Sequence, residues 1–241
     1  MSAVAVLLIA IGTADVLRRL VDRVWLPAAA APVVVIGCAA MAGLWRWGDI
    51  ALLVVAALSG VGWVVLSARA ERTGRHQVTP LVVFGGALGV LILLSGLSSE
   101  VAGVAARWPA WVGIEVSPDR LLMIVGVMFM QLVTGNQLVR LVLGSVGAVK
   151  PEGQPQASDR LKGGRLLGPM ERVLILGLGL AGQLTAATAV VAAKSIIRFP
   201  EINAQKAREN GGIGIDEITE YFLVGSFASW IVALGGLALA H

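Results

Sequence analysis

Long uncharged apolar stretches dominate the chain, and alternating or narrow amphipathic patterns are scarce. About 20 apolar residues in a helix cross the roughly 30 Å hydrocarbon core of a bilayer. Stretches of that kind recur along the whole sequence and predict an all-α, polytopic transmembrane bundle of about seven spans. The expected spans are Ser2–Leu17, Leu26–Leu44, Ile50–Ser67, Thr79–Leu97, Leu121–Leu143, Val173–Lys194 and Glu220–Ala240.

One polar segment interrupts this pattern. Val149–Gly168 is rich in Pro, Gly, Gln and Ser and has no apolar periodicity, which indicates a flexible cytoplasmic linker. It divides the chain into a five-span transmembrane region, residues 1–148, and a two-span C-terminal hairpin, residues 169–241.

Composition supports the membrane class. Of the 241 residues, 57% are hydrophobic and 14% are charged, whereas about 25% are charged in ordinary soluble domains. The net charge of +4 does not indicate nucleic-acid binding, because no basic face is interleaved with aromatic residues. The expected partners are the lipid bilayer and a membrane protein or a second copy of the chain. The single cysteine, Cys38, excludes an intramolecular disulfide.

Basic residues orient the predicted spans. If all seven cross, the clusters after the first span, after the third span and before the sixth share one side. Cytoplasmic loops are enriched in Lys and Arg, so the N-terminus is expected outside and the C-terminus in the cytoplasm. The clusters are Arg18, Arg19 and Arg23; Arg69, Arg72 and Arg75; and Lys150, Arg160, Lys162, Arg165 and Arg172.

The sixth predicted span contains a glycine fingerprint, G-x-G-x-x-G, at Gly177, Gly179 and Gly182. A dinucleotide site needs a strand before that turn and further βα units after it. Here the glycines lie within one uncharged run, so no cofactor is expected. Small residues four and seven positions after Gly182 instead predict close packing of the last two spans as an antiparallel pair.

Polar residues inside the spans supply the predicted site. Arg172, Gln183 and Lys194 recur every 11 residues, which places them on one face of a straight helix with Gln183 near the bilayer centre. Polar groups within a bilayer mark pathways or binding sites, although helix packing and snorkelling side chains are the alternative. The predicted polar or transport site consists of Gln131, Asn136, Arg140, Gln183 and Lys194.

Asp15 and the pair Arg198 and Glu220 suggest two further hypotheses. Asp15 lies in the first span four residues before Arg19, which favours an ion pair, with proton coupling as the alternative. Arg198 and Glu220 form a predicted external site if a cleft joins them to Lys194. No zincin, Walker A or nucleophile-elbow motif is present, so no catalytic residue and no metal site are predicted.

The C-terminal hairpin resembles a family of uncharacterised bacterial polytopic membrane proteins, defined only as a domain of unknown function. The resemblance covers about a third of the chain. It implies a bacterial inner-membrane protein and supplies no activity. The residues that carry it are Gly168–Arg172 (GPMER), Leu180–Gln183 (LAGQ), Ala192–Phe199 (AAKSIIRF) and Glu220–Ser226 (EYFLVGS).

Three functions therefore stay open. The first is a small-solute transporter, channel or carrier subunit with a polar site between the fifth, sixth and seventh spans. The second is a non-catalytic accessory or assembly subunit in which the same residues hold helices together. The third is a membrane-embedded enzyme using Glu171, Lys194 or Glu220, or a lipid-binding protein.

Overall fold

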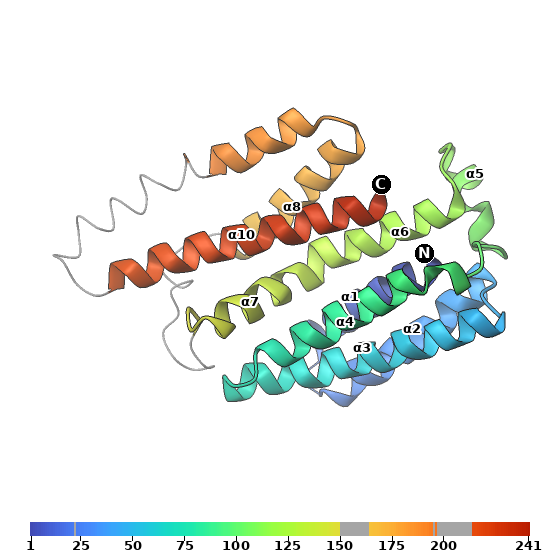
Figure 1. The fold of residues 1–241 in the computed structure, drawn as a ribbon, viewed down its shortest axis with the longest axis horizontal. Coiled ribbons are helices and arrows are strands. Elements are labelled where there is room, and N and C mark those ends of the chain that lie inside the picture. The colour runs from blue at the N-terminus through green and yellow to red at the C-terminus, as the bar shows by residue number, and fades with distance from the viewer. Residues whose placement is uncertain (22, 150–163, 195, 197–213) are drawn as a thin grey trace.

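The computed structural model describes residues 1–21, 23–149, 164–194, 196 and 214–241, and these residues form helices joined by turns. Figure 1 shows the long helices lying side by side in one bundle. The principal helices are α1 (Ser2–Leu20), α2 (Trp25–Ala42), α3 (Trp47–Thr73), α4 (Val78–Leu93), α5 (Trp108–Val112), α6 (Pro118–Phe129), α7 (Gly135–Ser145), α8 (Gly164–Leu180) and α10 (Gly214–Ala240). A further helix spans Leu184–Lys194. The short 3-10 turns η1 (Ser95–Leu97) and η2 (Ala105–Arg107) precede α5, and a π-helical turn, η3 (Met130–Thr134), joins α6 to α7.

Helix α1 is the centre of the bundle. Every residue from Ala3 to Gly12 is buried, and α1 packs against α2, α3 and α6. Small residues allow this approach: a Cβ at Gly126 would lie 2.8 Å from the Ala5 carbonyl oxygen, and one at Gly12 would lie 2.6 Å from Phe129 Cβ. The shortest of the predicted spans is therefore the most enclosed helix.

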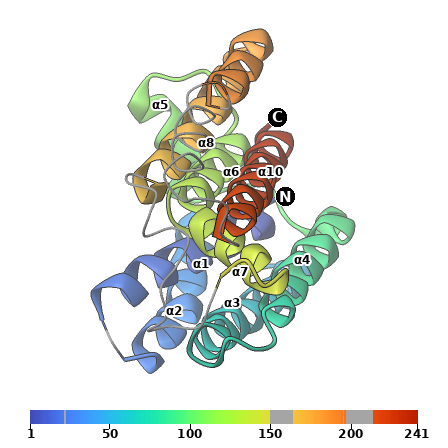
Figure 2. The same cartoon turned by 90° about the vertical axis from the view of Figure 1, so that its left-hand side faces the viewer.

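Helices α6 and α7 separate the two predicted parts of the chain. Figure 2, which looks along the bundle, shows α1–α4 on one side of them and α8 and α10 on the other. The α6–η3–α7 unit contacts both groups. Helix α8 begins at Gly164, inside the segment predicted as a linker, while residues 150–163 of that segment lie outside the described residues.

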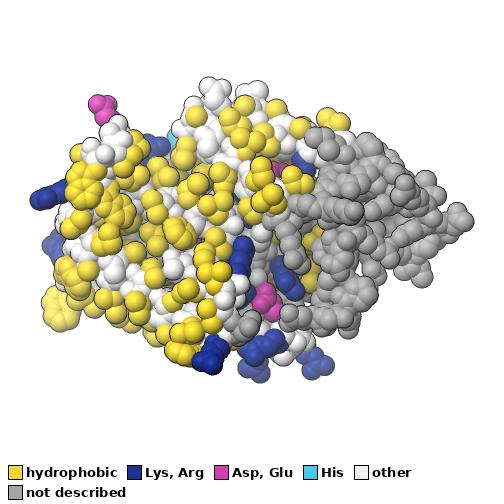
Figure 3. Space-filling model, turned by 180° about the vertical axis from the view of Figure 1, so that it is seen from behind, with side chains coloured by type: hydrophobic (Ala, Val, Ile, Leu, Met, Phe, Trp, Pro, Cys, Tyr) yellow, Lys and Arg dark blue, Asp and Glu magenta, His cyan; other side chains and the backbone are white. Residues whose placement is uncertain are grey.

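Four described helical stretches are long and apolar enough to cross a membrane, namely Trp25–Ala42, Trp47–Thr73, Pro118–Ser145 and Thr219–Ala240. Figure 3 shows apolar side chains over much of one face of the bundle. Leu58 and Val82 are among the exposed ones. An all-helical chain with apolar helices of spanning length is thus confirmed, whereas seven spans are not. Helix α1 carries three charges, Asp15, Arg18 and Arg19, and α4 has only 16 residues.

The sixth predicted span is not one helix, and the prediction of a straight Val173–Lys194 was wrong. Helix α8 ends at Leu180, and Gly182, two residues later, has a φ of +74°. The Gln183 N–H donates to the Leu178 carbonyl (2.8 Å) and the Gly182 N–H to the Gly179 carbonyl (3.0 Å). These two bonds close a Schellman motif, and glycine adopts its left-handed residue without steric cost. Hydropathy measures only the apolar run and does not detect the turn inside it.

The turn reverses the chain. Helix α8 runs parallel to α10, because Arg172 contacts Ser229 and Gly179 contacts Leu237. The helix Leu184–Lys194 then runs back beside α8, since Lys194 reaches Glu171. The expected antiparallel pairing of the last two spans is therefore wrong for α8 and α10. A stripe of small residues indicates close packing but does not specify whether two helices run parallel or antiparallel.

Both chain termini lie at the same end of the bundle (Figure 1). The Ser2 hydroxyl donates to Asp119 (2.9 Å), and Arg120 Nε donates to the Ala240 carbonyl (3.2 Å). This arrangement differs from the predicted placement on opposite sides, because the reversal at Gly182 removes one crossing. The other end, where α1 and α3 finish, carries Arg18, Arg69, Arg72 and Arg75 and is called the Arg-rich end below.

Candidate functional site

Arg172 is buried to 1% exposure near the middle of the bundle. Its Nε and Nη2 atoms donate to the Gln131 carbonyl oxygen at 3.1 and 2.9 Å. Nη2 also donates to Asn136 Oδ1 (2.8 Å), and Nη1 donates to the Ser229 hydroxyl (3.2 Å). Helices α7 and α10 and the turn η3 thus surround one guanidinium. A buried charge needs such partners, because leaving water without them costs several kcal/mol.

The π-helical turn η3 supplies the backbone acceptors. A π turn displaces carbonyl groups from the regular i+4 bonding pattern and is often found at functional sites. Two arginines donate into this turn: Arg172 to the Gln131 carbonyl, and Arg19 Nη2 to the Val133 carbonyl (3.1 Å). Arg172 thereby satisfies a buried carbonyl group of the irregular turn, and Arg19 makes its bond on the exposed side of the turn.

Glycines make room for this arrangement. A Cβ at Gly135 would lie 2.7 Å from Arg172 Nε, and a Cβ at Gly236 would collide with the Gln131 amide nitrogen. That amide nitrogen donates to the Val232 carbonyl at 2.9 Å. The small residues beside η3 therefore allow polar side chains to enter as well as helices to approach.

Glu171, next to Arg172 on α8, holds a second set of contacts. Its Oε2 atom pairs with Lys194 Nζ at 2.5 Å, and its Oε1 atom accepts from Trp230 Nε1 at 2.8 Å. Glu171 is 8% exposed, and the Lys194 side chain is 23% exposed. The returning helix Leu184–Lys194 is thus joined to α8 and α10 through one carboxylate. The Arg172 cluster below denotes Arg172, Glu171, Lys194, Gln131, Asn136, Ser229 and Trp230.

The structure brings only some of the predicted polar residues together. Gln131 and Asn136 meet at Arg172, and Lys194 pairs with the neighbouring Glu171. Gln183 is exposed in the turn after α8, so the predicted polar track through a straight helix is wrong. Arg140 lies elsewhere, with its Nη1 atom 4.0 Å from Glu71 at the Arg-rich end.

The predicted external site lies partly outside the described residues and stays a prediction. Arg198 lies outside the described residues, and Glu220 is an exposed residue near the start of α10. The reversal at Gly182 brings Lys194 back to Glu171, which is a partner that the sequence interpretation did not assign to it.

A second polar group surrounds Asp15, which is 4% exposed. The Trp63 indole Nε1 lies 3.2 Å from both carboxylate oxygens and donates to them. The Thr134 hydroxyl lies close to the same carboxylate without forming a hydrogen bond of normal geometry. The predicted ion pair with Arg19 is absent among the described contacts, because Arg19 donates to the Val133 carbonyl instead. The nearby Arg18 pairs with Glu71 at 3.1 Å.

Sequence reasoning underestimated Arg172, Ser229 and Trp63. It placed Arg172 at an interface because the uncharged run starts at Val173, although α8 starts at Gly164 and puts Arg172 well inside the helix. The sequence assigned no polar contact to Ser229 or Trp63. One available signal was the adjacent pair Glu171-Arg172, since opposite charges side by side next to an apolar run are suited to burial together.

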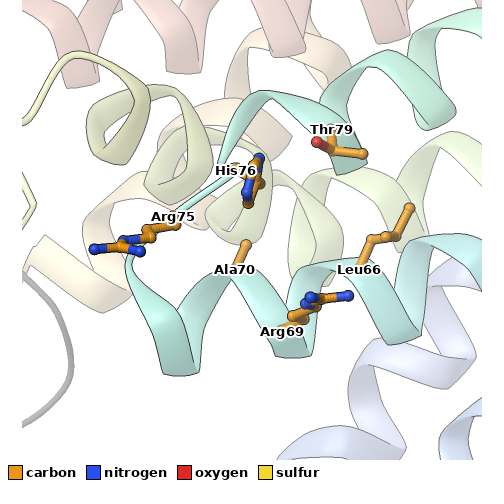
Figure 4. Close-up of a pocket in the computed structure, with 6 residues that line it drawn as sticks. All are labelled: Leu66, Arg69, Ala70, Arg75, His76 and Thr79. Carbon is orange, nitrogen blue, oxygen red and sulfur yellow. The ribbon is translucent and has the colours of Figure 1, made fainter.

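An open pocket at the turn between α3 and α4 lies apart from both clusters. Figure 4 shows its lining, with His76 above Ala70 and the Arg75 side chain directed away from it. His76 has a φ of +58°. The lining residues are Leu66, Arg69, Ala70, Arg75, His76 and Thr79. The pocket belongs to the surface of the Arg-rich end and does not reach the buried charges.

No protein-family model matches the chain, and no curated protein or solved structure is significantly similar to it. The resemblance of the C-terminal hairpin to uncharacterised bacterial membrane proteins therefore stays a prediction. The function is therefore inferred from the geometry of the two buried polar groups, around Arg172 and around Asp15.

Proposed function

We propose that the chain is a multi-pass membrane protein that carries or conducts a small anionic solute through the Arg172 cluster. The supporting observation is the depth of the charges. Gln131 lies halfway along the 28-residue apolar stretch Pro118–Ser145, and Arg172 binds its carbonyl group. Charged side chains at such depth are costly and typically serve a pathway. Arg172 and Lys194 against Glu171 leave one net positive charge, which favours an anion.

The returning helix, Leu184–Lys194, is the part of the proposed site that moves. Its contacts to the bundle include one small apolar cluster centred on Ile175, Ala187 and Ala233 and the ion pair between Lys194 and Glu171. An anion that competes with Glu171 for Lys194 would release this helix and expose Arg172. Lys194 then exchanges one anionic partner for another and stays paired throughout the step, while Glu171 keeps the Trp230 donor.

The test is anion efflux from liposomes that contain the purified protein. Vesicles are loaded separately with chloride, phosphate or acetate, and efflux is compared with that from protein-free vesicles. We expect faster efflux of at least one anion, and loss of that efflux in Lys194→Met. Arg140→Met is the matched control, because Arg140 is a half-exposed cation outside the cluster. Efflux equal to the protein-free rate for all three anions contradicts the proposal.

An accessory or assembly subunit is the second candidate, and a different observation favours it. Every side-chain nitrogen of Arg172 has an acceptor inside the chain, and both Glu171 oxygens have donors. Buried charges that are paired in this way can form a rigid joint between helices. This function predicts no efflux. It also predicts a defined homo-oligomer or heteromer, which native mass spectrometry of the protein in lipid nanodiscs detects.

Orientation and location are part of the proposal. The Arg-rich end is assigned to the cytoplasm of a bacterial inner membrane by the enrichment of basic residues on that side, which places both termini outside. Labelling with a membrane-impermeant maleimide tests this assignment in intact cells, in a Cys38→Ala background. We expect His241→Cys to be labelled and Arg75→Cys to be protected. The reverse pattern contradicts the orientation.

A further inference from the structure

Two buried aspartates, Asp49 and Asp15, have different surroundings. Asp49, at 1% exposure, accepts from the Ser99 N–H (2.7 Å), the Ser99 hydroxyl (2.8 Å) and the Arg46 N–H (3.1 Å). Asp15 accepts only from the Trp63 indole among the described hydrogen bonds. No described Lys or Arg nitrogen lies within 4.0 Å of it.

Unpartnered polar atoms gather around Asp15. The described residues contain five buried side-chain nitrogen or oxygen atoms without a hydrogen-bond partner. Four belong to residues on the helices and the turn around Asp15, and the fifth is Gln131 Oε1 in the Arg172 cluster. Native proteins leave few such atoms, and each calls for an explanation such as a bound water. The four are Arg18 Nη1, Ser67 Oγ, Thr134 Oγ1 and Gln137 Nε2.

Helical spacing places the residues that carry these atoms in rows along neighbouring helices. On α3, Trp63, Ser67 and Glu71 follow at intervals of four and share one face. Thr134 and Gln137 are three residues apart on η3 and α7, and Arg18 is three residues after Asp15 on α1. Asp15 contacts Trp63, and Arg18 contacts Glu71. The rows on α1 and α3 therefore lie side by side from Asp15 towards the Arg-rich end.

We propose that Asp15 is a proton-binding site at the inner end of a water-filled path from the Arg-rich end. A carboxylate enclosed by protein without a paired cation is costly, and taking a proton removes the cost. Mixed donors and acceptors, namely guanidinium, amide and hydroxyl groups, suit water, which needs two to four polar partners. The proton comes from water on that side and returns to it, so the exchange balances without another reactant.

The charges that face this path come from three helices. Arg18 and Arg19 belong to α1, Glu71 to α3 and Arg140 to α7. Helices α2 and α4 contain no charged residue, and the charges of α6, Asp119 and Arg120, lie at the opposite end. The Glu71 and Arg140 side chains are 23% and 46% exposed, so the path opens to solvent there. This site lies on the other side of η3 from Arg172, and proton binding holds whether or not anion efflux is found.

Infrared difference spectroscopy of the full-length protein in lipid, titrated with acid and base in potassium buffer, tests the proposal. We expect a protonated-carboxyl band that shifts when aspartate is labelled with 13C, is absent in Asp15→Asn and persists in Asp49→Asn. Trp63→Phe keeps Asp15 but removes its donor, and we expect the band to remain at a shifted frequency. An unchanged band in both Asp15→Asn and Trp63→Phe overturns the proposal, as does a wild type without any such band.

The path is tested separately through deuterium exchange of that band. Thr134→Val removes a hydroxyl from the path, and we expect slower exchange of the Asp15 proton. Thr188→Val makes the same change at an exposed threonine and is expected to leave the exchange rate unaltered. Equal rates in the two variants contradict a path through Thr134. Replacement of potassium by sodium is expected to have no effect, and a sodium-dependent band would assign the site to a metal cation instead of a proton.

Discussion

The two buried polar groups of this bundle lie on opposite sides of η3 and differ in how completely their atoms are paired. In the Arg172 cluster the guanidinium has three acceptor groups and Glu171 has two donors, and Gln131 Oε1 is its one buried atom without a described partner. Around Asp15, four buried polar atoms have no partner among the described residues. Buried polar groups therefore have two uses in this bundle. Paired charges fix helices in place, whereas unpaired polar atoms leave room for water and protons.

Removal of the central cation should break the satisfied cluster. In Arg172→Met, the buried Glu171 loses a neighbouring charge, and Asn136 and Ser229 lose a donor. We expect the free energy of unfolding in detergent to fall by about 3–5 kcal/mol, the range for breaking a buried charged network. Arg140→Met is the control, with a change of about 0.5 kcal/mol or less, because Arg140 is an exposed surface residue. Similar losses in the two variants would contradict the structural importance of Arg172.

A smaller change to the same cluster tests its packing alone. In Gly135→Ala, the new methyl group would lie 2.7 Å from Arg172 Nε, so the guanidinium or the turn has to move. We expect a loss of about 1–3 kcal/mol in the free energy of unfolding, as for other overpacked interiors. Gly89→Ala on α4 meets open space and should be neutral or stabilising by up to about 1 kcal/mol. A neutral Gly135→Ala would show that the cluster is looser than described.

The turn at Gly182 brings Lys194 back to Glu171. It is tested by whether an alanine substitution there raises or lowers the stability of the protein. Gly182→Ala places a side chain at φ +74°, so we expect destabilisation by about 1 kcal/mol. Gly177→Ala, in the middle of α8 with open space around it, should be neutral or stabilising. If the chain formed one straight helix through both positions, both alanines would stabilise it. Thermal unfolding of the two variants therefore separates the broken helix from the straight one.

The smallest effect is expected where polar atoms lack partners. Ser67→Ala removes a buried hydroxyl that bonds to nothing described, so the free energy of unfolding should change by about 0.5 kcal/mol or less. Ser229→Ala removes an acceptor from Arg172, and we expect a loss of about 1 kcal/mol. If the two variants lost equal free energies of unfolding in parallel experiments, the proposed difference between the two clusters would be contradicted.

Part of the site could be predicted from the sequence. Gln131 and Asn136 were singled out because amides inside an apolar run need partners, and they do share one, Arg172. Gln183 was assigned to the same site because its spacing from Arg172 and Lys194 fits a straight helix. That inference failed at a single backbone angle, the positive φ of Gly182. A glycine inside an apolar run fits both a packing contact and a turn.

The helical, strongly apolar character of the chain follows from its amino-acid order, because uncharged stretches of spanning length leave few other structures for the backbone. The segments that carry buried polar groups are recognisable in the same way. Three features required the folded structure: the shortest predicted span is the central helix, the helix after Arg172 turns back at Gly182, and both termini share one end. Hydropathy could not show them, because it depends on each residue separately. Direction, depth and pairing depend on contacts between residues far apart in the chain, such as Arg172 with Ser229 and Asp15 with Trp63.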